Sequence, residues 1–212
     1  MTDFPKGWRE VALGELFGLA NGFAYKSSSW KPSGIPVIKI ANVRNGKVSL
    51  DGCSYVAPSD SESEEKYGVK HGDMLMTLTG EIGAVGIYKE EIPARVNQRV
   101  ARIDVKGSSI TSIKALVLLL SAPHIKQALE KKSKGVAQPN LSPKDVLTLK
   151  TPLPPLAEQE RIVEILEEQF SKLDKALEVA NQLEARIASE RRSLLHSAFT
   201  GELTSQWRKT HV

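Results

Sequence analysis

The sequence predicts an α+β protein: a mixed α/β domain with a small twisted sheet, followed by one long coiled-coil α-helix. Short strand patterns separated by turns occupy residues 1–156, and a helical pattern without proline or glycine runs over residues 157–199. Three prolines, Pro152, Pro154 and Pro155, separate the two patterns, because proline and the residue before it disfavour a helix. We therefore predict a globular domain over 1–156, a long helix over 157–199 and a C-terminal tail over 200–212.

Composition limits the class of protein. Of the 212 residues 41% are apolar, which is enough for a core, but no run approaches the roughly 18 apolar residues of a membrane-spanning helix. The N-terminal stretch "MTDFPKGWRE" lacks the apolar segment of a signal peptide. The single cysteine, Cys53, excludes an internal disulfide, and no metal-ligand spacing occurs. We expect a cytoplasmic protein without membrane contact, metal or bound cofactor.

Charge is unevenly distributed along the chain. The net charge is +4; residues 1–156 carry 21 Lys and Arg against 15 Asp and Glu, and residues 157–212 carry 8 against 10. A basic domain joined to a mildly acidic helix suggests two separate tasks. Basic surface attracts phosphate backbones, although a solvated basic surface without a ligand explains the charge equally well.

Turn residues divide the domain into strands and a helical segment. Residues 35–51 are predicted to form one hairpin, because Asn45-Gly46 is a strong signal for a tight turn. Pro123 predicts a break or kink in the helical pattern of residues 109–135, close to His124. Three further strands are expected over residues 72–80, 83–90 and 97–105.

The long helix carries a heptad seam. Apolar residues alternate at spacings of three and four over more than four heptads, which is typical of a coiled coil. About 40 residues would form a rod of about 60 Å, which is too long for its apolar seam to be buried on a domain at one end. The seam therefore requires another helix, from a second copy or another chain, unless the long helix folds back on its own domain. The charged seam positions are Glu184 and Arg191. The predicted pairing residues are Val163, Leu166, Phe170, Leu173, Leu177, Ala180, Ile187 and Leu194.

Several motifs in order resemble one family. The stretch "PLPPLAEQERIVEILEE" (152–168) resembles a region of the specificity subunits of type I restriction-modification systems. Each further motif is weak alone, whereas the ordered set covers nearly the whole chain. The further motifs are "GWREVALGEL" (7–16), "GIPVIKIANVRNGKV" (34–48), "GDMLMTLTGEIGAVGIY" (72–88), "VNQRVARI" (96–103), "GVAQPNLSPKDVLTLKTPLPPLAEQERIV" (135–163) and "AFTGELTSQWRK" (198–209).

This resemblance implies a non-catalytic chain that recognises double-stranded DNA through a target recognition domain. It implies docking of two methyltransferase subunits, which would bind S-adenosylmethionine and modify adenine at N6, and of a translocating nuclease subunit, which would use ATP and magnesium. The usual subunit of the family has two recognition domains and two long helices paired antiparallel, whereas this sequence has one of each. It is therefore expected to be a natural half-subunit that dimerises, or a fragment of a longer subunit.

A symmetric dimer predicts the form of the DNA site. A rod of about 60 Å exceeds one turn of DNA, about 34–36 Å, so two domains could reach separate half-sites. Twofold symmetry then requires an inverted repeat with a spacer.

Recognition of bases requires Arg, Lys, Asn or Gln on exposed loops, and phosphate contacts use Lys, Arg, Ser and Thr. Each candidate residue could instead serve only its own turn, and Gly80 and Gly83 are better explained as turn residues than as a phosphate cradle. The predicted DNA contacts are Asn21, Lys26, Ser27, Lys39, Asn42, Arg44, Lys47, Thr79, Gln98, Arg99, Gln138 and Asn140.

The sequence can also be interpreted as an enzyme or as an adaptor. An enzyme is disfavoured, because the sequence has no P-loop, no nucleophile elbow and no methyltransferase tetrapeptide. A coiled-coil adaptor whose basic domain binds protein or RNA fits the heptads and the charge distribution. Arg191, Arg192 and Trp207 could contact a methyltransferase or could simply pack the end of the helix.

Overall fold

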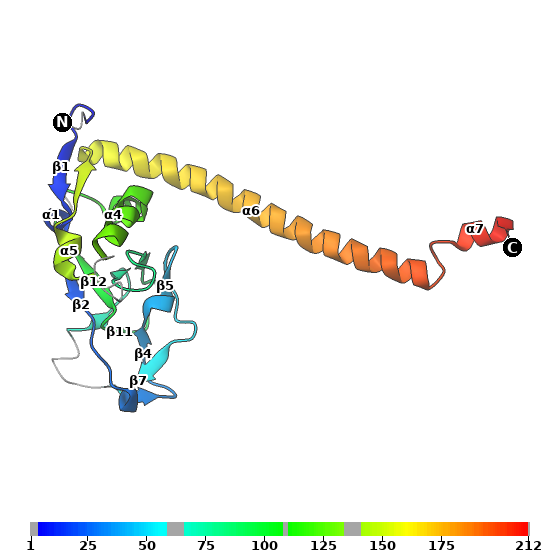
Figure 1. Cartoon of the computed structure of the whole chain (residues 1–212), viewed down its shortest axis with the longest axis horizontal. Coiled ribbons are helices and arrows are strands. Elements are labelled where there is room, and N and C mark those ends of the chain that lie inside the picture. Colours follow the sequence, from blue (N-terminus) through cyan, green and yellow to red (C-terminus); the bar gives the residue numbers. More distant parts are fainter. Residues whose placement is uncertain (1–3, 59–65, 108–109, 134–140, 212) are drawn as a thin grey trace. The chain divides into compact units, whose positions relative to one another are not determined.

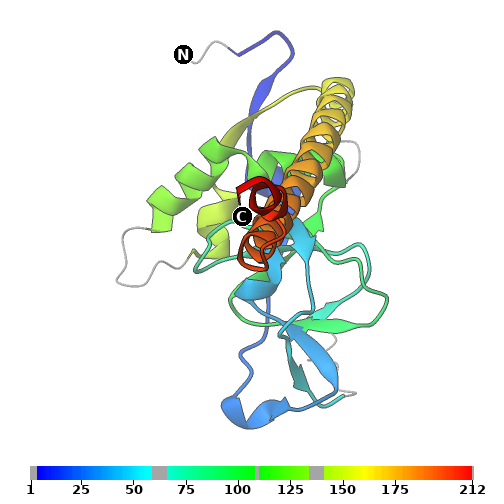
Figure 2. The same ribbon diagram turned by 90° about the vertical axis from the view of Figure 1, so that its right-hand side faces the viewer.

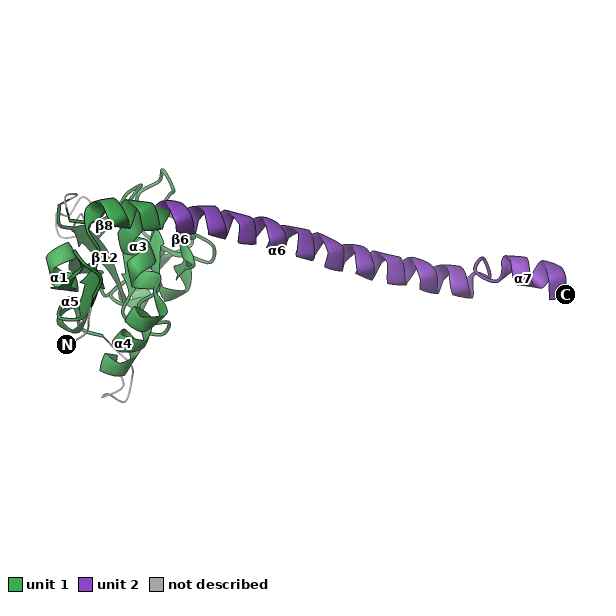
Figure 3. Cartoon of the chain, turned by 90° about the horizontal axis from the view of Figure 1, so that it is seen from above, with its two compact units in different colours: residues 1–163 green, residues 164–212 purple. Residues whose placement is uncertain are grey.

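The computed structural model describes residues 4–58, 66–107, 110–133 and 141–211. The chain divides into two compact units, residues 1–163 and residues 164–212 (Figure 3). The long helix begins at Leu156, and the compact units divide between Val163 and Glu164.

Unit 1 contains a mixed six-stranded sheet with the order β2-β12-β9-β10-β6-β5. Its strands pair antiparallel except for β10 and β6, which run parallel. The strands are β2 (Phe17–Asn21), β5 (Val43–Arg44), β6 (Gly46–Val48), β9 (Met74–Thr77), β10 (Val85–Ile87) and β12 (Val100–Val105).

A second, five-stranded sheet has the order β3-β7-β4-β11-β8. Here β4 and β11 run parallel and the other neighbours antiparallel. The strands are β3 (Trp30–Lys31), β4 (Ile35–Ile38), β7 (Ser54–Val56), β8 (Gly68–Val69) and β11 (Ala94–Val96).

Helices gather at one end of unit 1, and the five-stranded sheet lies at the other end (Figures 1 and 2). A first core lies between the six-stranded sheet and the helices, with Met76 and Ile103 from strands and Leu116 and Leu129 from helices. A second core joins the two sheets, with Leu75 and Val100 from one and Ile38 and Val96 from the other. The helices of unit 1 are α1 (Leu13–Leu16), α3 (Ile113–Ser121), α4 (Pro123–Ser133) and α5 (Pro143–Leu147), with 3₁₀ turns at Ser27–Ser29 and Ile40–Asn42.

The fold class is confirmed: a mixed α/β domain with sheets is followed by one long helix. The extent of the predicted 35–51 hairpin is wrong. The tight turn occurs, with φ of 51° at Asn45 and 75° at Gly46, but it joins only β5 and β6. The 3₁₀ turn at Ile40–Asn42 diverts the chain between the two sheets, so β4 pairs with β7 and β11 instead.

The predicted helical region is two helices, α3 and α4, separated at Ala122 before Pro123. The C-terminal end of the predicted helical pattern, at residue 135, lies outside the described residues. The proline connector is partly a strand: β13 (Lys150–Leu153) pairs antiparallel with β1 (Arg9–Ala12).

The long helix, α6, spans Leu156–Phe199, and its 44 residues give a length of about 66 Å. Its first turn is fixed within unit 1, where Gln159 Nε2 donates to the carbonyls of Pro154 and Ile110, both at 2.9 Å. Gly201, with φ of 81°, follows its end, as is typical of a glycine at a helix terminus. The tail forms a short helix, α7 (Ser205–His211).

Candidate nucleic-acid interface

Backbone hydrogen bonds bring together four of the loops that hold candidate DNA contacts, residues 21–27, 39–42, 77–83 and 97–99. The central loop is 97–99: Asn97 N–H donates to Ile38, and Gln98 N–H donates to Phe23, each at 3.0 Å. On its other side the Arg99 carbonyl accepts from Leu78 N–H at 3.0 Å. These four segments, which we call the loop cluster, are thus neighbours although they are far apart in the sequence.

Gly80 lets two of these loops approach closely. A Cβ atom added there would lie 3.3 Å from Cγ2 of Ile40, and its φ of 70° is unfavourable for other residues. Gly83, with φ of 74°, is likewise a turn residue, as predicted.

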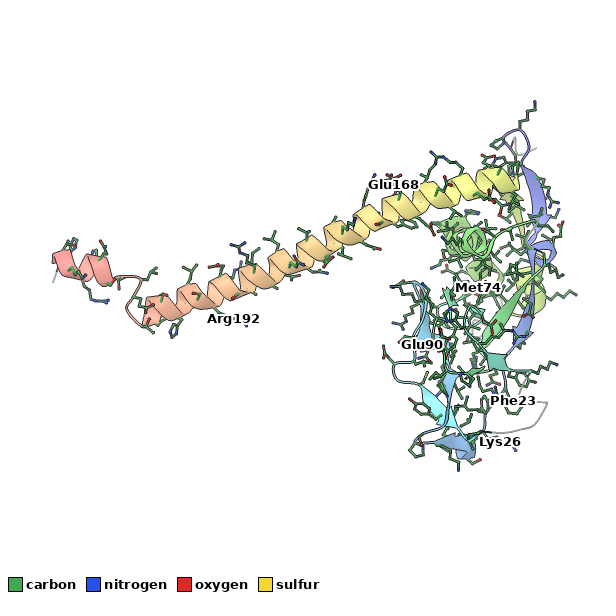
Figure 4. All side chains as sticks on the ribbon, turned by 180° about the vertical axis from the view of Figure 1, so that it is seen from behind. Phe23, Lys26, Met74, Glu90, Glu168 and Arg192 are labelled. Atoms are coloured by element: carbon green, nitrogen blue, oxygen red, sulfur yellow. The ribbon has the colours of Figure 1, made fainter. Side chains whose placement is uncertain are left out.

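Exposed polar side chains are available on the loop cluster. Asn21, Lys26, Ser27 and Gln98 are exposed, and Arg99 is half-buried. Figure 4 shows Phe23 and Lys26 close together at one end of unit 1. Exposed amides and cations on neighbouring loops can contact base edges and phosphates together.

Lys39 makes contacts within the domain. Its Nζ donates to Ser54 Oγ at 2.6 Å and lies 4.3 Å from the centre of the Trp30 ring. Burial raises the pKa of the neighbouring Cys53 thiol, and the positive charge of Lys39 opposes this shift. Lys39 is therefore held in place by an aromatic ring and a hydroxyl.

Aromatic side chains form a continuous row beside Lys39. Ring centres are 5.7 Å apart between Trp30 and Tyr25, 4.9 Å between Tyr25 and Phe23, and 5.2 Å between Phe23 and Tyr67. Phe23 is 38% exposed, so the row reaches the surface at the loop cluster.

Two of the predicted contact residues are buried. Asn42 is 5% exposed; its Oδ1 accepts from Lys39 N–H at 2.9 Å and its Nδ2 donates to the Asp51 carbonyl at 3.0 Å. These bonds give Asn42 a role in holding the 3₁₀ turn. Thr79 is also buried, and its hydroxyl has no hydrogen-bond partner among the described residues.

Arg44 and Lys47 face each other across the β5–β6 hairpin. Both are exposed, and like charges directly opposite each other destabilise a sheet. No described carboxylate forms an ion pair with either residue. The pair is thus suited to an anion such as a DNA phosphate.

The remaining candidates, Gln138 and Asn140, lie outside the described residues. Sequence reasoning missed Arg95 and Arg102, which line a cleft in the sheet region, and it missed the connected row of rings. Both arginines stand in strands among apolar residues, a pattern that gives no signal for a site.

The predicted seam of α6 is largely exposed. Phe170, Leu173, Leu177, Ile187 and Leu194 are between 47% and 63% exposed, Ala180 is exposed and Leu166 is half-buried. Val163 is only 7% exposed, so this seam residue is already buried in the single chain. Leu183 and Val179, which lie off the seam, are 56% and 63% exposed.

Within the described part of the chain, no group of three His, Cys, Asp or Glu side chains could hold a metal ion. No helix of that part is long and apolar enough to cross a membrane.

Comparison with known proteins assigns the family. A family model described as the type I restriction modification DNA specificity domain matches residues 5–188. The chain therefore belongs to this family, as its motifs predict.

Two curated relatives extend the comparison. The specificity subunit of the type I restriction enzyme EcoBI from Escherichia coli is 30% identical over 96% of this chain and 44% of its own length. The MjaVIII specificity subunit from Methanocaldococcus jannaschii is 27% identical over 95% of this chain and 47% of its own length. The chain thus spans less than half the length of these relatives.

Solved structures share the fold. A structure of a type I restriction-modification assembly matches with a TM-score of 0.71 and 21% identity, over 93% of this chain and 47% of that chain. The HsdS subunit from Thermoanaerobacter tengcongensis matches with a TM-score of 0.58 and 23% identity, over 82% and 41%. The type IIG restriction endonuclease BpuSI has a TM-score of 0.55 at 11% identity, over 75% and 26%.

Proposed function

We propose that this chain is the DNA sequence-recognition component of a cytoplasmic type I restriction-modification enzyme, and that it acts as a dimer paired through α6. In this role it performs no chemistry and positions methyltransferase subunits, and with them a nuclease subunit, on double-stranded DNA. The observation that carries the proposal is the match to DNA specificity subunits over 96% of this chain and only 44% of the relative. One recognition domain and one helix are thus present where the relatives are about twice as long.

The loop cluster supports contact with DNA. It presents exposed amide and cationic side chains on neighbouring loops, and the Arg44–Lys47 pair adds two positive charges that form no ion pair with a described carboxylate. The excess of positive charge in residues 1–156 favours association with a phosphate backbone.

The seam supports pairing with a second copy, because it is complementary to itself. In an antiparallel coiled coil the a positions of one helix face the d positions of the other. If a twofold axis passes level with Glu178 and Val179, all ten seam residues meet a seam partner. The layers are Val163 with Leu194, Leu166 with Arg191, Phe170 with Ile187, Leu173 with Glu184, and Leu177 with Ala180.

This register also accounts for residues beside the seam. Leu183, exposed in the single chain, would lie against Ala176 of the second copy. A shift by one heptad toward the C-terminus places Leu166 opposite Ala198, near the end of α6, and leaves without a seam partner only Val163, which is already buried in the single chain. We propose the register centred at residues 178–179, which sets Phe170 opposite Ile187, whereas the shifted register sets Phe170 opposite Leu194.

Two measurements on the purified chain test the proposal. Light scattering over a dilution series should give about twice the chain mass of 23.2 kDa. Selection of duplexes from a randomised pool, with the cognate methyltransferase subunit present, should recover a bipartite inverted repeat with a spacer of constant length. A monomer that selects a single half-site would contradict the dimer, and the absence of any DNA selection would contradict the recognition role.

Salt dependence separates DNA recognition from an adaptor role. Each phosphate contact releases counterions, so binding to duplex should weaken steeply between about 50 and 200 mM salt. An adaptor whose contacts are mainly apolar should show little change over the same range.

A further inference from the structure

Arg95 is a buried cation for which the described residues supply no ion-pair partner. It lies in the middle of β11, is 8% exposed, and its Nε has no hydrogen-bond partner among the described residues. No described carboxylate forms an ion pair with it. Arginine stays protonated in proteins, so the guanidinium is positively charged in this buried position.

A buried charge without a counter-charge destabilises a folded protein. Burial of an arginine in a core is rare unless the charge is paired. An anion that arrives from outside the chain would supply the missing partner, and Arg95 is placed where such an anion can reach it.

Arg95 lines an open cleft of about 490 Å³ together with Lys70 and Arg102, which we call the cationic cleft. Arg102 is held in place: its Nη1 donates to the Gly68 carbonyl at 2.8 Å, and its Nε donates to Asp104 at 3.1 Å. Lys70 directly follows the edge strand β8.

Among the described residues that line the cleft, the carboxylate is supplied by Asp73. Its Oδ2 already accepts a hydrogen bond from the backbone N–H of Lys70 at 2.9 Å. Three cationic side chains therefore face one carboxylate that is engaged in its own turn. Asp104 neutralises part of the charge of Arg102, and no carboxylate in the described part of the chain forms an ion pair with Arg95 or Lys70.

The cationic cleft adjoins the loop cluster. Gly68, which lines the cleft, follows Tyr67, whose ring packs 5.2 Å from that of Phe23. On the neighbouring strand Arg95 stands two residues before Asn97, which belongs to the loop cluster. A DNA backbone that passes the loop cluster could therefore continue into the cleft.

We propose that the cationic cleft binds a phosphate group of the DNA backbone, with Arg95 as the principal ligand and Lys70 and Arg102 beside it. The planar guanidinium fork matches phosphate oxygens in a bidentate arrangement. Such a contact fixes the register of the domain on the duplex and carries no base information. This inference rests on the proposed function, since it names a site used in DNA recognition.

The test replaces Arg95 by methionine in the full chain and measures binding to a duplex of random sequence, about 30 base pairs long, at several salt concentrations. The affinity should fall about tenfold, and the slope of log K against log salt should decrease by about one phosphate contact. The melting temperature of the unliganded Arg95→Met variant should stay unchanged or rise, because an unpaired buried charge has been removed. Arg9→Met is the matched control, since Arg9 is exposed on β1 and pairs with Glu15 at 3.8 Å; it should leave the affinity nearly unchanged.

Lys70→Gln, at an exposed residue, provides a second variant if Arg95→Met does not fold, and it should reduce the salt slope in the same direction. If the wild type binds duplex and these variants bind it with unchanged affinity and salt slope, the phosphate site is wrong but the proposed function is not contradicted. A wild-type chain that binds no duplex would overturn the proposed function as well.

Inorganic phosphate distinguishes the two sources of the group. If millimolar phosphate raises the melting temperature of the wild type but not of Arg95→Met, while both bind duplex equally, the cleft takes a small free anion and the DNA assignment is wrong. Loss of duplex binding in Arg95→Met supports the DNA backbone as the source.

Discussion

Gln159 and Ile110 are joined by a partly buried hydrogen bond: the side-chain amide of Gln159 donates to the Ile110 carbonyl at 2.9 Å. The same nitrogen donates to Pro154, also at 2.9 Å, and Gln159 is 4% exposed. One residue thus links the first turn of α6 to the proline segment and to the loop before α3. This gives a physical role to the glutamine of the "PLPPLAEQERIV" motif.

Replacement of Gln159 by alanine should lower the free energy of unfolding by about 1–3 kcal/mol, because the carbonyls of Pro154 and Ile110, both partly buried, lose their donor. Chemical denaturation measures this change. Gln169→Ala, at an exposed position of the same helix, should change stability by about 0.5 kcal/mol or less. Equal effects of the two substitutions would show that the buried contacts of Gln159 contribute nothing specific.

Replacement of Leu177 by glutamate should convert a dimer into a monomer, because the substitution places a charge in the central layer of the seam. Val179→Glu is a stringent control: Val179 is 63% exposed and Leu177 61%, yet Val179 lies on the opposite side of the helix. Sedimentation should find the Val179→Glu chain dimeric. The double variant Leu173→Glu/Leu177→Glu should be monomeric at every concentration, and its persistence as a dimer would refute the seam.

Cysteine pairs test the direction and register of the helices on a Cys53→Ser background. Phe170→Cys combined with Ile187→Cys should form a disulfide-linked dimer, because the two positions share a layer in the antiparallel register. Phe170→Cys alone should not, since its symmetry mate would lie 17 residues along the rod, about 26 Å away, beyond the reach of a disulfide.

Other outcomes of this experiment are equally informative. Cross-linking of Phe170→Cys alone would indicate parallel helices. Cross-linking of Phe170→Cys with Leu194→Cys, in place of Ile187→Cys, would indicate the register shifted by one heptad.

Features of the fold that depend on neighbouring residues could be predicted from the sequence, whereas features that depend on distant residues could not. The long helix, its end at Phe199 and the glycine that follows are set by neighbouring residues, and so is the turn at Asn45-Gly46. One of the two partners of β4 is β11, which lies more than 50 residues further along the chain. No local pattern reveals such a pairing. The pattern of residues 35–51 therefore predicts a single hairpin, whereas β4 and the β5–β6 hairpin belong to two different sheets.

The site shows the same limit. Exposed polar residues on loops, such as Lys26 and Gln98, are recognisable because their neighbours are turn residues. Burial of Asn42 and of Arg95 depends on which strands pack around them, and the strand pattern around Arg95 predicts only a sheet. The family resemblance could supply the function, but it could not identify a buried cation.

Tyr88 should make the domain sensitive to alkali. Its hydroxyl donates to the Ile92 carbonyl at 2.7 Å, and burial, with a smaller contribution from the charge of Glu90, raises the pKa of Tyr88 to about 12. Because the pKa in the folded state lies above that in the unfolded state, this stabilisation is complete below about pH 10 and is lost as the pH rises toward 12. Tyr88→Phe should cost about 1 kcal/mol at neutral pH through the lost hydrogen bond, and the difference from wild type should shrink between pH 10 and 12. Tyr55→Phe, at a half-buried residue of β7, is the control that should retain the wild-type decline; a constant difference between wild type and Tyr88→Phe across this range would show that Tyr88 does not cause it.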